Sequence, residues 1–243
     1  MPIVIIFVLF LAACATPQGN ASVTTYRDAK HLLYSEIYYD HPHTLYCGAE
    51  FDPKTRAISA NANAFQFNTE RAHHVEVEHI VPAENFGRSF SEWREGAPQC
   101  VNAKTGKPYK GRKCAETNPE FQRMESDLHN LAPAIGAVNA ARKNYRFGMV
   151  PEGIQSAFGE SCNFKIHDRT VEPPDSVKGL VARTHLYMAA TYPKRFRLSR
   201  QQQQLFEAWD RMFGPDSWEC EREKRIARVQ GNRNTFTVKK CGN

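Results

Sequence analysis

Hydrophobic residues recur at helical spacing in several stretches of the chain. In residues 27–39 the apolar side chains fall mostly on one side of a helix, at Ala29, Leu32, Leu33, Ile37 and Tyr38. Three segments nearer the C-terminus also predict helices: the one after the Pro173–Pro174 pair, SRQQQQLFEAWDRMF with Ser199 as its cap, and CEREKRIARVQGN, which Gly231 ends.

The middle of the chain predicts a strand, a long loop and a pair of helices. In residues 74–81, valines and His79 alternate with acidic residues, as expected for a strand, and Pro82 ends the pairing. Residues 91–120 are polar and predict a long loop, a kind of segment that is often functional. Residues 118–144 predict two helices, the second with Pro133 in its first turn.

These elements predict an α+β fold that is mixed and mainly helical. The chain has 243 residues and shows no internal repeat and no clear linker within residues 26–241. That length is enough for one large domain with a substantial core. We therefore expect a single domain over residues 26–243.

The N-terminus predicts export. PIVIIFVLFLAA is about a dozen residues, too short to span a bilayer, and is typical of a signal peptide, although no Lys or Arg precedes it. LAAC, ending at Cys14, is similar to a bacterial lipobox, in which the cysteine is lipidated. We expect a signal peptide at 1–14 and a linker at 15–25. A lipidated Cys14 would attach the protein to a membrane, and ordinary cleavage would leave it free.

Cysteine usage and charge add to this picture. Six cysteines remain without Cys14, and an even number in an exported chain predicts three disulfides, with Cys100–Cys114 favoured because the two bracket a short loop. No CxxC pair is present, which disfavours a zinc site. The formal net charge of +6 permits a polyanionic partner without requiring one. The six candidates are Cys47, Cys100, Cys114, Cys162, Cys220 and Cys241.

Glu78 and His79 are the residues that most suggest chemistry. A carboxylate suits a hard divalent cation, and a neutral imidazole can take a proton from water. Phosphodiester hydrolysis uses both groups. The alternative is an ordinary strand with a surface Glu and a half-buried His. Either Asn130 or Asn139 could complete a magnesium site by residue type alone.

The order of these residues, a strand-borne His before a helix-borne Asn, is the layout of the ββα-metal (His-Me) finger nucleases. The chain resembles the bacterial endonuclease I family, exported non-specific nucleases with that finger. The matching segments cover nearly all of residues 27–241: HPHTLYCG (41–48), VEHIVPAENFG (77–87), GRKC (111–114), FQRMESDLHNLAPAIGAVN (121–139), ARTHLYM (182–188), SRQQQQLFEAWD (199–210) and WECEREKRIARVQGN (218–232).

The resemblance implies a role for each matching residue. Glu78 and Asn139 would hold one Mg²⁺, with Ca²⁺ or Mn²⁺ as alternatives in the same site. His79 would be the general base, Arg112 would contact the scissile phosphate, and Glu125 would be an orienting acid close to the site.

Basic residues just after Asn139 could meet the DNA backbone, namely Arg142, Lys143 and Arg146, although a charged helix end is the simpler interpretation. The expected activity is sequence-non-specific hydrolysis of single- and double-stranded DNA, and of RNA as a further substrate, to 5′-phosphate ends. We expect a monomer without an obligate protein partner, in the periplasm, outside the cell or anchored to the outer membrane. The alternatives are an exported nucleic-acid-binding lipoprotein without catalysis and a metal-independent phosphodiesterase.

Overall fold

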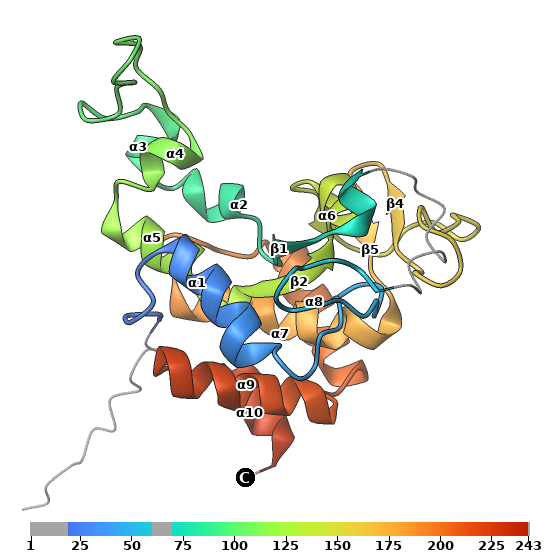
Figure 1. The fold of residues 1–243 in the computed structure, drawn as a ribbon. Coiled ribbons are helices and arrows are strands. Elements are labelled where there is room, and N and C mark those ends of the chain that lie inside the picture. The colour runs from blue at the N-terminus through green and yellow to red at the C-terminus, as the bar shows by residue number, and fades with distance from the viewer. Residues whose placement is uncertain (1–18, 60–69, 243) are drawn as a thin grey trace, which may run out of the picture.

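The computed structural model describes residues 19–59 and 70–242. Helices predominate around two small sheets, which gives the mixed α+β domain that the sequence predicts (Figure 1). Within the described ranges, no helix is long and apolar enough to cross a membrane. The predicted signal peptide 1–14, with Cys14, and the first part of the predicted linker lie outside the described residues.

The helices and strands follow one another along the chain in a single order. They are α1 (Tyr26–Leu32), the π-helix η1 (Leu33–Ile37), the 3₁₀-helix η3 (Glu70–His73), β1 (Val75–His79), α2 (Ala83–Gly87), α3 (Ser91–Arg94), α4 (Arg112–Ala115), α5 (Pro119–Glu125), the 3₁₀-helix η4 (Leu128–Asn130), β2 (Leu131–Ile135), α6 (Gly136–Arg142), β3 (Arg146–Phe147), β4 (Lys165–His167), β5 (Thr170–Glu172), α7 (Asp175–Thr191), α8 (Arg200–Met212), α9 (Ser217–Gln230) and α10 (Thr235–Cys241).

A two-stranded antiparallel sheet followed by a helix forms the centre of the fold. β1 pairs with β2, with His79 opposite Leu131, and α6 follows β2 directly. The prediction of a helix that starts at Pro133 is wrong, because Pro133 lies in β2. A sheet of only two strands tolerates this proline, and its carbonyl accepts a hydrogen bond from Leu45 N at 2.8 Å.

Gly136 begins α6 where the backbone of η3 passes very close. A Cβ at Gly136 would lie 2.6 Å from the carbonyl oxygen of Arg71 and 2.8 Å from a carboxylate oxygen of Glu76. A side chain at this position would therefore push α6 away from β1. The glycine thus sets the distance between the strand and the helix that carry the predicted metal ligands.

The N-terminal helix is shorter than predicted and changes its hydrogen-bonding pattern. α1 is α-helical only to Leu32, and the wider turns of η1 continue to Ile37. Part of the predicted linker also packs on the domain. Asn20 is buried, accepts a hydrogen bond from Val23 N and donates to the carbonyl of Arg123 at 2.9 Å. Because Asn20 and Val23 are buried against the domain, residues 20–25 do not form a free linker in the structure.

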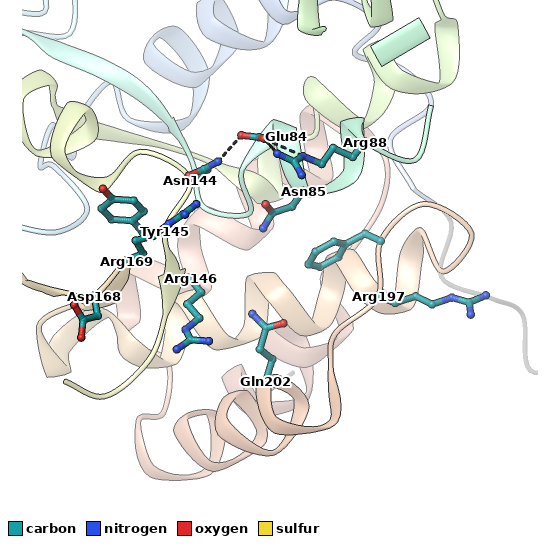
Figure 2. A pocket seen from close by; sticks show the side chains of 11 residues that line it. Glu84, Asn85, Arg88, Asn144, Tyr145, Arg146, Asp168, Arg169, Arg197 and Gln202 are labelled. Atoms are coloured by element: carbon teal, nitrogen blue, oxygen red, sulfur yellow. Dashed lines mark hydrogen bonds and ion pairs between the residues drawn. The ribbon is translucent and has the colours of Figure 1, made fainter. Parts of the chain in front are cut away.

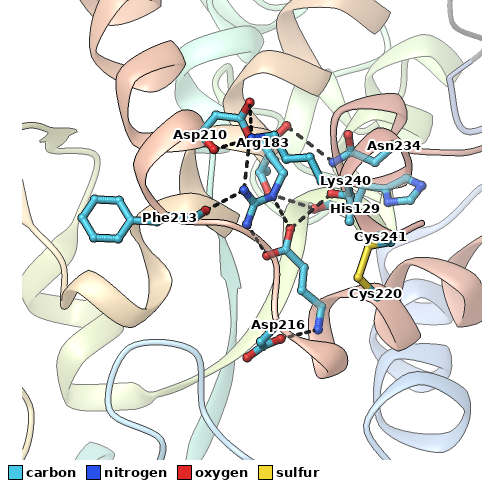
Figure 3. A network of polar contacts seen from close by, with 12 residues as sticks. His129, Arg183, Asp210, Phe213, Asp216, Cys220, Asn234, Lys240 and Cys241 are labelled. Atoms are coloured by element: carbon cyan, nitrogen blue, oxygen red, sulfur yellow. Dashed lines mark hydrogen bonds and ion pairs between the residues drawn. A yellow bond between two sulfur atoms is a disulfide. The ribbon is translucent and has the colours of Figure 1, made fainter.

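The C-terminal helices α7 to α10 pack together around a buried ion pair (Figure 3). The guanidinium of Arg183 on α7 donates two hydrogen bonds to Glu219 on α9, at 2.6 and 2.5 Å. It also reaches the carbonyl of Phe213 at 2.8 Å. Removing one partner of such a buried pair typically costs about 3–5 kcal/mol, so this network ties α9 to α7. Ser199 caps α8 and Gly231 ends α9, as predicted.

Three disulfides connect the described residues, as predicted, and one of them is the favoured Cys100–Cys114 pair. The other two are Cys47–Cys162 and Cys220–Cys241. The predicted loop 91–120 is broken by α3 and α4, and Cys114 lies within α4. The Cys100–Cys114 disulfide therefore ties the short helix α4 to the long polar segment that precedes it.

The main hydrophobic core lies between the central sheet and the C-terminal helices. Ala132 of β2, Val138 of α6 and Phe206 of α8 belong to the same buried cluster. A second cluster, around Phe86 and Phe121, supports α2 and α5. β1, α6 and the end of α5 thus rest on packed side chains, which gives the polar residues they carry a rigid base.

Candidate active site

Four of the five predicted catalytic and metal-binding residues line one hollow of about 470 Å³. Glu78 and His79 come from the end of β1, Asn139 from α6 and Arg112 from the start of α4. Arg112 and Asn139 both lie far from His79 along the chain and are brought to it by α4 and α6. The structure therefore brings together a carboxylate, an imidazole, an amide and a guanidinium.

Glu78 is almost completely buried, with an exposed fraction of 2%. Tyr46 donates its hydroxyl hydrogen to Oε1 at 2.7 Å, and Nη1 of Arg142 lies 3.3 Å from the same oxygen. Burial raises the pKa of Glu78, whereas the Arg142 charge and the Tyr46 hydrogen bond act in the opposite direction. Since both partners contact Oε1, Oε2 is the atom left to bind a cation.

His79 is buried and held through one ring nitrogen. Nε2 lies 2.9 Å from the carbonyl oxygen of Glu125. A carbonyl only accepts, so Nε2 carries the hydrogen, and Nδ1 keeps its lone pair in the neutral ring. Burial, reinforced by the charges of Arg112 and Arg142, lowers the pKa of His79 to about 3. The imidazole is therefore neutral near pH 7, the form that can accept a proton.

Arg112 is held by the carboxylate of Glu125, to which its Nε donates a short hydrogen bond. Its guanidinium also lies 4.8 Å from the ring centre of Tyr26. Nη2 of Arg112 is buried and, within the described part of the chain, has no hydrogen-bond partner. A buried donor without a partner is costly, and a phosphate oxygen entering the hollow would supply one.

Asn139 and Asn130 have different surroundings, which separates two residues that sequence spacing left equivalent. Asn139 donates its amide hydrogen to Glu76 at 2.8 Å, which leaves the amide oxygen for another partner. Asn130 is fully buried, and its amide bonds both the N–H of Val81, at 2.7 Å, and the carbonyl of Val81, at 2.9 Å. Asn130 therefore fixes the chain just after His79, and Asn139 is the amide that lines the hollow.

Arg142 does not fit the expectation that it contacts the DNA backbone. Its exposed fraction is 1%, and it donates to the carbonyls of His79 and Ile80 at 3.0 and 2.6 Å. Arg142 thus stabilises the end of β1 and places a positive charge beside Glu78. Lys143, exposed at the rim of the hollow, and Arg146, exposed in a neighbouring hollow, remain accessible.

Two tyrosines that were not predicted from the sequence contribute to the site. Tyr46 holds Glu78, and Tyr26 lies beside His79, with ring centres 5.1 Å apart. Tyr46 precedes Cys47, whose disulfide to Cys162 anchors this segment. The sequence signal for Tyr46 was its position in segment 41–48, one of the segments that resemble the nuclease family. Nothing in its local sequence pointed to a carboxylate partner.

The donor set suits a hard divalent cation. Glu78 and Asn139 offer oxygen atoms, and such cations take carboxylate and amide oxygens with waters in the remaining positions. A cation would also offset the desolvation of the buried Glu78 carboxylate. Across residues 19–59 and 70–242, no three His, Cys, Asp or Glu side chains gather as they would around zinc.

Comparison with known proteins gives a family. The chain matches the endonuclease I family over residues 20–241. It is 39% identical to an extracellular deoxyribonuclease of Aeromonas hydrophila, with 89% of this chain and 90% of the relative aligned. It is also 39% identical to a periplasmic deoxyribonuclease of the same species, over 93% and 91% of the two chains.

A third relative is an endonuclease-1 of Buchnera aphidicola subsp. Baizongia pistaciae, 31% identical over 96% of this chain and 92% of the relative. The protein therefore belongs to the endonuclease I family, in agreement with the resemblance seen in its sequence.

Proposed function

We propose that the protein is an exported, metal-dependent endonuclease that hydrolyses DNA without sequence specificity and leaves 5′-phosphate ends. The observation that carries this proposal is the convergence of Glu78, His79, Arg112 and Asn139 on one hollow in a chain of the endonuclease I family. RNA presents the same phosphodiester and is a further proposed substrate. The names of the extracellular and periplasmic relatives support export.

His79 is the proposed general base. The hydrogen bond from Nε2 to the Glu125 carbonyl orients the ring, so Nδ1 takes the proton from the attacking water. The depressed pKa keeps this nitrogen unprotonated before the reaction. The Glu125 carboxylate holds Arg112, whose planar donors bind the oxygens of the scissile phosphate.

The proposed ligands of one Mg²⁺ are Oε2 of Glu78 and the amide oxygen of Asn139, and Mn²⁺ or Ca²⁺ would suit the same atoms. When bound, the metal supplies positive charge that stabilises the transition state and the leaving 3′ oxygen. Arg142 and Tyr46 fix the other oxygen of Glu78. Their role is to keep the carboxylate ionised and correctly turned.

Low sequence specificity follows from the kind of contacts available. The exposed groups at the rim, such as Lys143, suit phosphates, which carry no direct sequence information. Binding should therefore weaken steeply as salt rises, because phosphate contacts release counterions.

A plasmid-nicking assay with and without EDTA tests this function. We expect nicking with Mg²⁺, loss of nicking in EDTA and recovery when Mg²⁺ is returned. Nicking that resists EDTA would support a metal-independent phosphodiesterase, and DNA binding without nicking under any divalent cation would support a non-catalytic binding protein. A Glu78→Gln variant, which keeps the shape of the side chain but removes its charge, should show the same loss without EDTA.

A further inference from the structure

A second hollow, of about 600 Å³, lies beside the candidate active site. Figure 2 shows the side chains that line this second hollow. Glu84 and Asn144 line both hollows, so the two are adjacent. The walls of the second hollow come from separate parts of the chain: α2, the segment around β3, the turn between β4 and β5, and the residues around the start of α8. A linear ligand in the active site could continue into it.

Arginines dominate the charge of this second hollow. Arg88, Arg146, Arg169 and Arg197 line it, all exposed, against two acidic residues, Glu84 and Asp168. Glu84 is already engaged, because Arg88 pairs with it and Asn144 donates to it (Figure 2). The hollow therefore has an excess of positive charge and suits an anionic ligand.

Three of these arginines keep their charge available. Nε of Arg146 donates to Thr170 at 3.2 Å and Nε of Arg197 to the carbonyl of Pro193 at 2.9 Å, and both partners are neutral. In the part of the chain that the structure describes, no ion pair is formed by Arg146, Arg169 or Arg197. Their guanidinium groups differ in this from Arg183, which is satisfied by buried carboxylates.

Arg169 also occupies a backbone position that disfavours it. Asp168 and Arg169 form the two-residue turn between β4 and β5, with φ of 43° and 58°. Positive φ at both positions is what a type I′ turn requires, and Asp-Gly and Asn-Gly are the preferred pairs there. An arginine in place of the glycine is unfavourable for the backbone. A residue held in such a conformation on the wall of a charged hollow points to a functional role.

We propose that this second hollow binds the phosphate backbone of the nucleic acid next to the scissile phosphate, with Arg169 as a principal contact. The inference rests on the proposed nuclease function and adds a flanking subsite to it. Nucleic acid fits better than a small anion, because the arginines come from separate elements and are exposed along an open hollow. Each would meet a different phosphate of a repeating backbone.

The test is the variant Arg169→Gly, which gives the turn its preferred Asp-Gly pair while removing the charge. We expect the melting temperature to stay the same or rise. KM for long duplex DNA should increase about three- to tenfold near physiological salt. The slope of log affinity against log salt should become shallower by the amount expected for the loss of about one phosphate contact. A merely structural role for Arg169 would not change the salt slope.

Arg56→Gly is the matched control. Arg56 also has a positive φ, of 63°, is exposed, and lines neither hollow. This change relieves the same kind of backbone conformation and removes the same charge elsewhere, so KM and salt slope should stay close to wild type. Arg197→Gln is a second variant in the hollow and should act in the same direction as Arg169→Gly.

Substrate length sharpens the result. A thymidine dinucleotide cannot occupy a flanking subsite fully, so the loss of kcat/KM caused by Arg169→Gly should be several-fold larger on long duplex than on the dinucleotide. Equal losses on both, or an unchanged salt slope, would overturn the inference. The subsite can be tested separately from catalysis by measuring salt-dependent DNA binding in a His79→Ala background. Failure of wild-type protein to cleave any DNA would overturn the proposed function instead.

Discussion

The carbonyl oxygen of Glu125 lies 2.9 Å from Nε2 of His79 and fixes the tautomer of that imidazole. The carboxylate of the same residue holds Arg112. One residue at the end of α5 therefore positions both the proposed base, through its backbone, and the proposed phosphate ligand, through its side chain. This arrangement allows the two functions to be separated, because a substitution changes the side chain and leaves the carbonyl in place.

Glu125→Gln should weaken catalysis while leaving His79 correctly oriented. The amide preserves the size of the side chain but removes the charge that pairs with Arg112, so the guanidinium loses its fixed position. We expect kcat/KM on plasmid DNA to fall about 10- to 100-fold, comparable to losing one oriented donor. Steady-state kinetics with Mg²⁺ provides the measurement.

The control for that variant is Glu120→Gln on the same helix. Glu120 pairs with Arg195 rather than with a site residue. The same chemical change there should leave kcat/KM near the wild-type value. Equal losses from the two variants would mean that Glu125 acts through α5 as a whole and not through Arg112.

Strand β1 and the longest helices, α7, α8 and α9, could be predicted from the sequence because their signals are local. Alternation in residues 74–81 gave β1, and the Ser199 cap and Gly231 gave the ends of α8 and α9. Pro133 was misjudged because proline at a helix start is a local rule. Its place in β2 depends on pairing with Val77, more than fifty residues earlier. Pairing of that kind cannot be read from local pattern.

The two asparagines should respond differently to removal of their amides. Asn139→Ala removes a proposed metal ligand, so the rise in melting temperature on adding Mg²⁺ should shrink, since stabilisation follows metal affinity. Asn130→Ala leaves the Val81 N–H and carbonyl buried without partners, at a cost of about 1–3 kcal/mol each. It should lower the melting temperature strongly with and without the metal.

Thermal unfolding across a Mg²⁺ titration distinguishes these outcomes. If Asn139→Ala kept the full Mg²⁺-dependent shift, Asn139 would not be a ligand. Asn130 would then have to be reconsidered as the amide that matters.

Two disulfides of similar loop length should have separable effects. Cys100–Cys114 spans 14 residues and Cys220–Cys241 spans 21, so each should stabilise the fold by about 3 kcal/mol in the chain-entropy description. Cys114 lies two residues after Arg112, on α4. Replacing Cys100 and Cys114 by serine should therefore lower kcat/KM even at a temperature where the variant remains folded.

Replacing Cys220 and Cys241 by serine is the comparison, because that disulfide joins α9 to α10, and neither helix lines the hollow. This pair should lose stability but keep kcat/KM at a temperature where it remains folded. A strong reductant should inactivate the wild-type protein. Full activity of the Cys100/Cys114 variant would separate Arg112 from its disulfide.

Acid should destabilise the metal-free protein, partly through His185. Burial lowers the pKa of His185 to about 3, and its ring stacks on Phe206 with centres 4.2 Å apart. Between pH 6.5 and 3 the unfolded chain binds a proton at this residue and the folded chain does not. The free energy of unfolding should therefore decrease as the pH is lowered. This group alone should contribute a loss of about 2 kcal/mol between pH 7 and pH 5.

His185→Phe keeps a ring against Phe206 and removes the titration. Urea unfolding in EDTA at pH 7 and at pH 5 should show a smaller difference for the variant than for the wild type. If both proteins lost equal stability over this range, His185 would be protonated in the folded state or would not contribute.

The candidate site was predictable where residue type determines chemistry and not where packing determines contacts. Glu78, His79 and Asn139 carry recognisable chemistry in a recognisable order. Arg142 was assigned to the surface because a basic residue at a helix end is usually solvated, yet the carbonyls at the end of β1 bind it in the interior. Tyr46 was missed because its partner Glu78 is 32 residues away and reached only through the fold.

The central claim is that His79 is the general base. The direct measurement is the rate of plasmid nicking by His79→Ala with Mg²⁺, in protein shown to be folded by its melting temperature and to bind DNA like the wild type. We predict a loss of about 10²- to 10⁴-fold in kcat with little change in DNA affinity, as expected for a missing general base. A rate near that of the wild type would contradict the account.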